Sequence, residues 1–507
     1  MLKRKTADDA KTVLVHLIMV ALWTAVPMIR ANCVSANPPN VVMVLTDDQA
    51  PWAFATAVRS GQFSGVPIPS TPHLDRLASD GAVFRNFFCT TPVCSPARAT
   101  LMAGRYASDL GIADFIPQPG HKLYDPDHAV FLDPDTTTTL AEMFQSRGYR
   151  TGLIGKWHLG DWTDSNDRSK HPTAHGFDTF MGLTGGGTKP RDPELEIEGK
   201  LRQFKGLTTD ILTDHAIEFI HQNVDQTFFL CLSTRAPHGP WLPVAPEDWE
   251  PYQEMDPTIP DEPGLDRKAI RKKMKEYLAS TTGVDRNLGR LLKVIDDHQL
   301  RDKTVVIFTS DHGYNMGHNG IWHKGNGIWA TKQKPPGDTH HGVRVISPKY
   351  RPNLYDLSLR VPAIFRWPGI VEPSTVVDAT ATHLDWFPTL CSVAGDEAFA
   401  DGLPGRDLSP LLTGNTPDDW DQGFYSEYDM INYAQASLRG YRTPQFKLVR
   451  DRWNEGCDEF YDLRSDSDEN ENLIQSDDPI IRNAIEALDA KLMSIERPAS
   501  QALKMER

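Results

Sequence analysis

Internal repeats, low-complexity segments and an excess of positive charge are all absent from this sequence of 507 residues. No pattern recurs at the spacing of about 20 to 50 residues that marks repeat proteins, and the 36 glycines and 38 prolines follow no period. These absences exclude collagen-like, solenoid and linker-type chains. The net charge of -15 argues against nucleic acid as a partner, because a phosphate backbone is bound by clustered lysines and arginines. With 39% hydrophobic residues, the chain can bury one large core or two unequal ones.

Long hydrophobic runs are scarce as well, and the exception lies near the N-terminus. Lys3, Arg4 and Lys5 precede the apolar stretch 13–29, and small residues follow it as far as Ala36. This order predicts a secretory signal peptide over residues 1–36, cleaved after Ala36. An uncleaved membrane anchor is the alternative, but a histidine and a proline interrupt the stretch. We therefore expect an exported protein, periplasmic or extracellular, with no membrane span once the leader is cleaved.

Cysteine is rare, with 6 residues, and none of them forms a paired zinc-type motif. Cleavage of the leader would remove one and leave five, so at least one thiol of the exported chain is unpaired or chemically altered. Cys231 and Cys391 have the apolar surroundings of buried, inert thiols, whereas the pairing of Cys89 and Cys457 stays open. Among the cysteines, Cys94 has the unusual sequence neighbours.

Short apolar runs alternate with helical patterns over the first four fifths of the chain. The runs 41–46, 150–154, 228–233 and 305–310 are typical of strands buried on both faces, and residues 269–298 carry a helical repeat of apolar residues. This alternation predicts an α/β fold, a large domain with a mostly parallel, mixed β-sheet flanked by helices. Polar residues follow the carboxyl ends of these strands, where such sheets bind ligands: Asp47, Asp48, Lys156, His158, His238, Asp311 and His312.

The character of the chain changes near residue 413. A polar linker is followed by short strand-like pieces and by a closing helical pattern over residues 479–495. We expect a catalytic domain over residues 37–417. Residues 418–507 are expected to form a C-terminal α+β subdomain, a small antiparallel sheet with a helix packed on it.

Cys94 begins the segment Cys94-Ser-Pro-Ala-Arg98, which leads into a stretch of good helix formers. A helix whose first turn begins at Pro96 would place Cys94 at its N-terminus and Arg98 one turn on. Such a position favours anions and thiolates. Taken alone, such a segment is commonly a capped helix that carries an inert, buried cysteine.

The segment Cys94 to Arg98, with Leu101 and Gly104, resembles the activation motif of the type I sulfatases, a family of the alkaline-phosphatase-like superfamily. A second stretch, Gly148 to His158, is similar to the other signature of that family. The resemblance covers most of residues 38–415 and, more loosely, the C-terminal part. It implies that a maturation enzyme oxidises Cys94 to formylglycine, whose aldehyde hydrate is the nucleophile.

The resemblance also implies one divalent cation. Asp47, Asp48 and Asp311 offer hard oxygen ligands, and Cys94, as formylglycine, would be a further ligand. An Asp-Asp pair after a strand is more often a turn or a helix cap, but Asp311 and the signatures favour the metal. His312 occupies the position where many members of the family have asparagine. Its nitrogen is a softer ligand than the carboxylate oxygens. We expect Ca²⁺, with Mg²⁺ as the alternative.

By the same resemblance, five further side chains surround the reaction. Arg98 and Lys156 would contact the formylglycine hydrate. His158 would be the base that removes a proton from the remaining hydroxyl, so that sulfate is eliminated and the aldehyde regenerated. His238 and Lys324 would bind the sulfate and help to protonate the departing alcohol. The role of the adjacent His323 stays open.

The resemblance implies a sulfuric ester hydrolase, and we expect a sulfated saccharide as its substrate. Residues 325–354 look like an insertion rich in basic and aromatic residues, which could attract a sulfated chain. Trp322 and Trp329 would offer flat faces to sugar rings, although a solvated charged loop is an equal alternative. The competing functions are an arylsulfatase for small molecules, a phosphoester or phosphonate hydrolase of the superfamily, and a catalytically silent carbohydrate-binding protein.

Overall fold

The computed structural model describes residues 38–125, 130–160, 168–183 and 185–495. The predicted signal peptide, residues 1–36, lies outside these described residues. Within the described ranges, no helix has the length and apolar character needed to cross a membrane.

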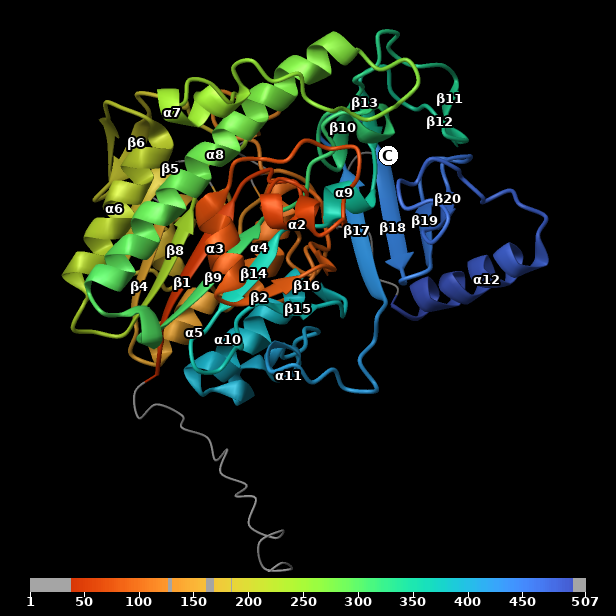
Figure 1. The fold of residues 1–507 in the computed structure, drawn as a ribbon. Helices are drawn as coiled ribbons and strands as arrows, with labels where there is room; N and C mark the ends of the chain where they lie inside the picture. The colour runs from red at the N-terminus through yellow and green to blue at the C-terminus, as the bar shows by residue number, and fades with distance from the viewer. Residues whose placement is uncertain (1–37, 126–129, 161–167, 184, 496–507) are drawn as a thin grey trace, which may run out of the picture. The chain divides into compact units, whose positions relative to one another are not determined.

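A mixed sheet of ten strands forms the centre of the fold (Figure 1). Its order is β15-β2-β14-β9-β1-β8-β4-β5-β6-β7, and the middle strands β9, β1, β8, β4 and β5 run parallel. The parallel strands are β9 (Thr304–Ser310), β1 (Asn40–Thr46), β8 (Phe228–Ser233), β4 (Arg150–Lys156) and β5 (Thr179–Leu183). The flanking strands are β15 (Thr375–Val377), β2 (Ala82–Phe84), β14 (Ala363–Arg366), β6 (Glu194–Ile197) and β7 (Lys200–Gln203). The predicted α/β class is confirmed.

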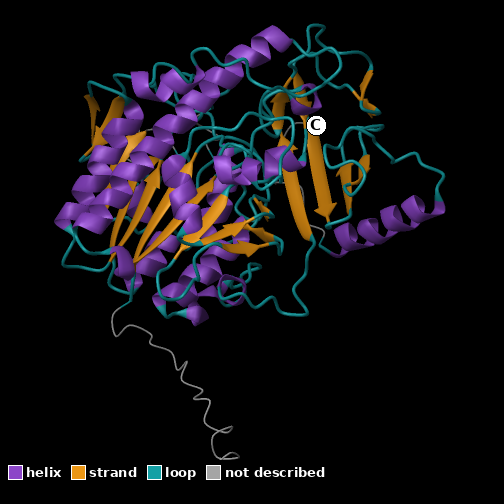
Figure 2. Cartoon of the chain, viewed as in Figure 1, coloured by secondary structure: helices purple, strands orange, loops and turns teal. Residues whose placement is uncertain are grey.

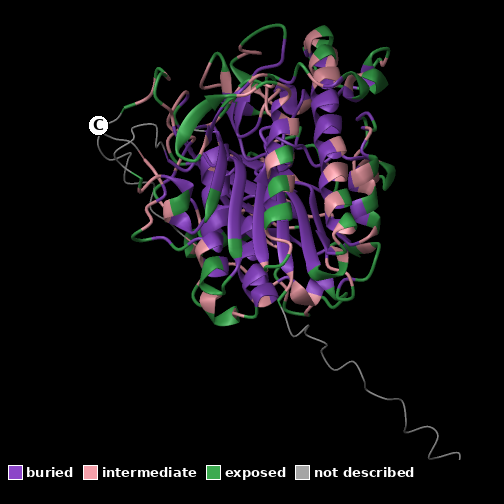
Figure 3. Ribbon diagram, turned by 90° about the vertical axis from the view of Figure 1, so that its left-hand side faces the viewer, coloured by how far each residue is buried: buried purple, intermediate pink, exposed green. Residues whose placement is uncertain are grey.

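Helices cover both faces of this sheet, as Figure 2 shows. Along β1, Val41, Met43 and Leu45 pack with α4 (Cys94–Ala103), α5 (Leu140–Ser146) and α10 (Trp386–Ala394). Val42 and Val44 face the other way, toward α3 (Pro72–Ser79), α6 (Thr208–Gln222) and α8 (Arg267–Asp297). Successive side chains of a strand point to opposite faces, so a continuous apolar run supplies both cores. Figure 3 shows the resulting burial of the central strands.

Several short elements complete this part of the chain. The short helices are α2 (Ala55–Arg59), α7 (Pro246–Trp249), α9 (Asp356–Leu359) and α11 (Ser409–Leu412), and β3 (Phe87–Phe88) pairs with β16 (Ala381–Thr382). All five described cysteines are buried and free, so Cys89 and Cys457 do not form a disulfide with each other. Cys231 lies in β8 as expected, but Cys391 lies within α10 instead of following a helix.

The C-terminal part forms the expected small antiparallel sheet, in the order β17-β18-β19-β20. Its strands are β17 (Phe424–Met430), β18 (Ala436–Arg442), β19 (Phe446–Asp451) and β20 (Glu459–Asp462), and α12 (Pro479–Ser494) packs on them. Tyr428 and Leu438 share an apolar cluster with Val93 and Ala97, at the start of α4. The sheet therefore supports the helix that carries Cys94, whereas the domain boundary at residue 417 stays a prediction.

The insertion 325–354 is folded, contrary to the solvated-loop alternative. In it, β10 (Asn326–Ile328) pairs with β13 (Tyr350–Pro352), and β11 (Thr339–His340) pairs with β12 (Val343–Arg344). Trp329 is fully buried, and the buried Arg351 lies 2.9 Å from Glu459. The prediction that Trp329 offers a face to sugars is wrong, because the ring is part of an apolar cluster with Tyr355.

Buried charges also join α9 to the C-terminal sheet. Asp356 of α9 lies 2.9 Å from the guanidinium of Arg442 and 3.1 Å from the ammonium of Lys447, which lies 2.6 Å from Glu469. Burial alone would raise the pKa of Asp356, but Arg442, Lys447 and Arg360 hold it well below its usual range. This carboxylate therefore stabilises the fold above the pKa of an unfolded aspartate, and the contribution is lost as the pH falls through the folded pKa.

We predict that Asp356→Ala lowers the free energy of unfolding by about 3–5 kcal/mol, because the buried guanidinium of Arg442 loses its carboxylate partner and Lys447 keeps only Glu469. Asp297→Ala is the matched control, since its ion pair with Lys293 is exposed, and a change below about 1 kcal/mol is expected there. Denaturant unfolding at neutral pH measures both. Equal effects of the two substitutions would contradict the structural role of Asp356.

Candidate active site

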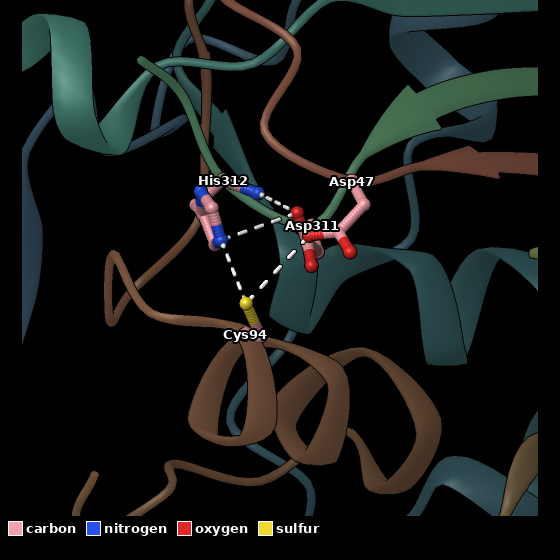
Figure 4. Close-up of side chains that lie close together, drawn as sticks. All are labelled: Asp47, Cys94, Asp311 and His312. Carbon is pink, nitrogen blue, oxygen red and sulfur yellow. Dashed lines mark hydrogen bonds and ion pairs between the residues drawn. The ribbon is translucent and has the colours of Figure 1, made fainter. Parts of the chain in front are cut away.

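The carboxyl ends of the central strands bring the predicted acidic residues together. Thr46 of β1 is in register with Ser310 of β9, so Asp47 and Asp311 follow at neighbouring positions. The backbone N–H of Asp311 donates to the carbonyl of Thr46 at 3.0 Å, which fixes the two turns against each other. Figure 4 shows Asp47, Asp311 and His312 meeting the side chain of Cys94.

Each of the three buried aspartates has its own buried cation. Lys156 Nζ lies 2.6 Å from Asp47 Oδ2, and Lys324 Nζ lies 2.5 Å from Asp48 Oδ1. Arg98 Nε donates to Asp311 Oδ2 at 2.9 Å. Burial by itself would raise the pKa of Asp47 and of Asp48, but Lys156 and Lys324 respectively hold them well below the usual range. Asp47 and Asp48 are therefore carboxylates at neutral pH.

Asp48 adopts a left-handed backbone conformation, with φ of 67°, which is uncommon for a residue that has a side chain. Its backbone N–H donates to Asp311 Oδ1 at 3.2 Å, and this bond holds the turn. Its Oδ2 is buried and has no hydrogen-bond partner among the described residues. Buried, unpaired carboxylate oxygens are costly, and a strained turn that maintains one is typical of a functional site.

Cys94 is the first residue of α4, two residues before the predicted start at Pro96. Its Sγ lies 2.8 Å from Lys324 Nζ, 3.4 Å from His312 Nε2 and 3.6 Å from Asp47 Oδ1. Burial nevertheless raises the pKa of the Cys94 thiol to about 11, against the lowering effect of Lys156 and Lys324. The prediction that this position favours a thiolate is wrong, because desolvation and the nearby aspartates outweigh the cations.

His312 presents one ring nitrogen to this cluster. Its Nδ1 lies 3.0 Å from the carbonyl of Gly313, to which a protonated Nδ1 donates. Nε2 then carries a lone pair, 3.3 Å from Asp48 Oδ1 and 3.3 Å from Asp311 Oδ1. Burial lowers the pKa of His312, so the ring is neutral and free to bind a metal.

Two further predicted residues, His158 and His238, line a cavity beside Cys94. His158 Nε2 lies 3.0 Å from the carbonyl of Ile116, and its Nδ1 is buried with no hydrogen-bond partner among the described residues. His238 Nδ1 lies 2.7 Å from the carbonyl of Gly239, and its Nε2 lies 3.8 Å from Asp48 Oδ2. Burial lowers the pKa of both histidines, so each is neutral at pH 7.

The cavity has a volume of 620 Å³ and draws its lining from distant segments. Lys324 and His323 line it, as do the loop 115–121 and, from the insertion, Lys349 and Tyr350. Arg98 and Lys156 are not among the lining residues. All ten side chains predicted for the site therefore lie in one cluster or on its cavity, whereas Trp322 and Trp329 do not line it.

Comparison with known proteins identifies the family. The pattern of the family described as "Sulfatase" matches residues 39–396, and that described as "N-sulphoglucosamine sulphohydrolase, C-terminal" matches residues 351–497. The chain belongs to the sulfatase family. It is a sulfuric ester hydrolase with the fold of the alkaline-phosphatase-like superfamily.

Its relatives include two bacterial carbohydrate enzymes. It is 25% identical to an N-acetylglucosamine-6-O-sulfatase of Bacteroides thetaiotaomicron, over 87% of this chain and 85% of the relative. It is 29% identical to an ulvan-active sulfatase of Formosa agariphila, over 90% of this chain and 80% of the relative. A structure solved with its substrate D-glucosamine-2-N,6-O-disulfate shares the fold, with a TM-score of 0.71, 21% identity and coverage of 90% of this chain and 99% of that one.

The residues present fit the metal ion that the sulfatase family implies. Asp47, Cys94, Asp311 and His312 each place a ligand atom within 4.8 Å of the others, and Asp48, whose Oδ2 is unpaired, forms an overlapping group with Asp47, Cys94 and His238. The three carboxylates are already balanced by Arg98, Lys156 and Lys324. A divalent ion would therefore leave the site with net positive charge, which suits the anionic ester that a sulfatase binds.

Some residues of the active site and of its cavity could not be predicted from the sequence. Ser233 accepts from Arg98 at 2.7 Å and donates to the carbonyl of Lys156 at 2.7 Å, so it fixes two of the predicted cations. The signal in the sequence for Ser233 was its position at the end of an apolar strand. Gln118 and Tyr433 line the cavity of the sulfatase, but neither belongs to a motif, since both lie in irregular segments.

We predict that unmodified Cys94 reacts slowly with iodoacetamide at pH 7 in the presence of a chelator. The rate should rise about tenfold per pH unit toward pH 11, because the thiolate is the reactive species. Peptide mass spectrometry locates the alkylated residue, and Cys94→Ser controls for the other buried thiols. Rapid alkylation of Cys94 at pH 7 would show that the nearby cations lower the pKa of the thiol more than burial raises it.

Proposed function

We propose that this sulfatase removes O-sulfate groups from sulfated saccharides outside the cytoplasm, with Cys94 matured to formylglycine and one Ca²⁺ bound beside it. The observation that carries the proposal is the position of Cys94, buried among three carboxylates and three cations and lining a polar cavity. A thiol whose pKa is about 11 is a poor nucleophile at neutral pH. An aldehyde hydrate at the same carbon would place an oxygen where Sγ lies.

Lys324, Lys156 and Arg98 act on that oxygen by position and charge. Lys324 Nζ already lies 2.8 Å from Cys94 Sγ, so its ammonium can donate to an oxygen at that place. The pKa of Lys324 is raised, because Asp48 and Cys94 outweigh the effect of burial, and the group stays protonated. Arg98 holds Asp311 and the carbonyl of Lys156, and thereby keeps the donors around the nucleophile in place.

The cation would be held by Asp47, Asp48, Asp311 and His312, together with the formylglycine oxygen. When bound, it supplies positive charge that stabilises the anionic nucleophile and ester. Carboxylate oxygens favour Ca²⁺ or Mg²⁺, and the four protein ligands suit the higher coordination number of Ca²⁺. His312 contributes a neutral nitrogen, which keeps the charge of the ligand set at that of the three aspartates.

His158 is placed to take a proton. If Nε2–H donates to the carbonyl of Ile116, the unpaired Nδ1 carries the lone pair of a base. Burial holds its pKa well below 6.5, so the base is free at neutral pH and becomes protonated only in acid. His158 also has a left-handed backbone, with φ of 60°, which aims the ring after the end of β4.

His238 and Lys324 are placed on the side of the leaving group. His238 lines the cavity and is partly exposed, unlike the buried His158 and His312. The pKa of His238 is lowered by burial, and an anionic sulfate beside it would raise that pKa again. Substrate binding thus favours the protonated ring, which can deliver a proton from Nε2 to the departing alcohol oxygen.

The lining of the cavity supports a saccharide. Lys349 and Lys324 provide cations for sulfate, and the rings of Tyr350 and Tyr433 stack with centroids 4.5 Å apart. These tyrosines, instead of the tryptophans predicted from sequence, form the aromatic wall. A volume of 620 Å³ admits one or two sugar rings. The names of the two bacterial relatives, which act on sulfated N-acetylglucosamine and on ulvan, favour the same class.

We predict that enzyme from a host with the maturation machinery releases sulfate from a panel of sulfated glycans and carries an aldehyde at Cys94. Cys94→Ala should fold normally and lose at least about 1,000-fold in kcat, because the nucleophile is gone. Sulfate release and peptide mass spectrometry measure the two properties. Full turnover by chains whose Cys94 is entirely unmodified would rule out this mechanism.

We predict that Asp311→Ala abolishes binding of the active-site cation, since a carboxylate ligand is lost and Arg98 loses its partner. His312→Asn is the matched variant and should retain both metal and partial activity, because an amide oxygen replaces the ring nitrogen. Metal analysis after dialysis distinguishes Ca²⁺ from Mg²⁺. Unchanged metal content in Asp311→Ala would place the ion elsewhere.

We predict that Lys349→Ala and Tyr350→Ala each raise KM for a sulfated oligosaccharide about five- to tenfold and leave kcat nearly unchanged. Turnover of a small aryl sulfate should change little, because only the larger ligand reaches these side chains. Lys332→Ala, in the same insertion but away from the cavity lining, is the control. Equal losses on both substrates would mean that the insertion supports the active site instead of binding sugar.

A further inference from the structure

A second group of metal-ligating side chains lies outside the active site. Glu262 belongs to the segment before α8, and His340 and His341 belong to β11 and the turn that follows it. His340 Nε2 lies 3.2 Å and His341 Nε2 lies 3.0 Å from the same oxygen, Glu262 Oε1. All three side chains are largely buried, with 9%, 14% and 5% of His340, His341 and Glu262 exposed. We propose that Glu262, His340 and His341 bind a Zn²⁺ ion or a similar divalent transition-metal ion.

The hydrogen bonds of His341 point to a cation between these groups. Its Nδ1 lies 2.7 Å from the carbonyl of Asn470, so a proton on Nδ1 is donated there. In a neutral ring, Nε2 then carries a lone pair that faces a carboxylate oxygen at 3.0 Å. Two lone pairs at this distance repel, so a proton or a metal ion must lie between them. Metal-binding histidines commonly donate their other N–H to a backbone carbonyl, as His341 does.

The spacing of the ligand atoms also fits a single ion. Ligands bound tetrahedrally at about 2.0 to 2.2 Å lie about 3.3 to 3.6 Å apart. The distances of 3.2 and 3.0 Å from Glu262 Oε1 are slightly shorter, so a small outward shift of the side chains would admit the ion. One carboxylate with two imidazoles is a ligand set that zinc favours over calcium, because nitrogen donors suit the softer ion.

The surroundings leave room for the ion and for a further ligand. A Cβ atom at Gly320 would lie 2.8 Å from His340 Nε2 and 3.6 Å from Glu262 Oε1, so a side chain there would crowd the ligand atoms. The three side chains also line a cavity of 430 Å³, together with Thr331, Gln333 and Thr339. Water entering from this cavity would complete the coordination of the ion.

The site would join three segments that are distant in sequence. Glu262 anchors it to the segment before α8, the two histidines to the insertion, and Asn470 to the C-terminal part. The same insertion supplies Lys349 and Tyr350 to the active-site cavity. A zinc ion here would fix the insertion in the position that lines that cavity, and it would do so without contacting the reacting atoms.

Zinc analysis tests the proposal on the full chain. Cys94→Ser in excess Ca²⁺ is the parent, since the substitution and the calcium prevent zinc from binding at the active site. After equilibration with Zn²⁺ and dialysis, about one zinc per chain is expected in the parent and less than about a tenth of that in its His341→Ala and Glu262→Gln derivatives. His221→Ala is the matched control, because His221 and His298 form a histidine pair, 2.7 Å apart, that lacks this carboxylate.

A parent that binds no zinc would overturn the proposal and leave an imidazolium–carboxylate pair at this place. Zinc retained by both derivatives would overturn it as well, because the ion would lie elsewhere. Should the derivatives fail to fold, carbethoxylation of the parent decides the question. Zinc should protect His340 and His341 from diethylpyrocarbonate, as mapped by peptide mass spectrometry, and should leave His221 reactive. Equal modification with and without zinc would overturn the proposal.

Discussion

Three aspartates and three cationic side chains are buried together at the carboxyl ends of the central strands, and neither set could be buried without the other. A buried charge that lacks a partner costs several kcal/mol, so the pairs Asp47 with Lys156, Asp48 with Lys324, and Asp311 with Arg98 have to form as a unit. Because the opposite charges neutralise each other, the folded chain can hold these ionised groups away from water. It also means that any added divalent ion turns the site positive, which is the charge that a sulfate ester requires.

The rest of the structure maintains this arrangement. The parallel register of β1 and β9 sets Asp47 beside Asp311, and Ser233 of β8 fixes Arg98 against β4. The C-terminal sheet packs against the start of α4 and so holds Cys94 from the other side. The insertion closes the cavity with Lys349 and Tyr350. Residues from the whole length of the described chain are thus needed to build one site, and the described residues from Pro39 onward form a single compact unit.

Two failures of sequence-based expectation, at the insertion and at Cys94, share one cause. Trp329 was expected to face the substrate, and the basic residues of the insertion were expected to attract it, yet Trp329 and Arg351 are buried. Cys94 was expected to favour a thiolate because cations are near, yet burial raises its pKa. Composition shows which side chains are present. Whether a pKa is raised or lowered, and whether a side chain can contact a ligand, depends on whether water reaches the group. Desolvation depends on how the whole chain packs, so no local sequence pattern indicates it.

The sequence by itself determined the α/β class and the family, and it predicted ten site residues that the structure brings together. Short continuous apolar runs that alternate with helical patterns are typical of strands buried on both faces, and polar residues that follow parallel strands gather at one edge of the sheet. The motif around Cys94 is local and needs no knowledge of packing. Only the tertiary structure decided that Tyr350 and Tyr433 form the wall of the cavity and that Glu262 meets His340 and His341. These contacts join segments separated by roughly eighty residues in sequence, and the energy that selects them comes from packing, which no local pattern records.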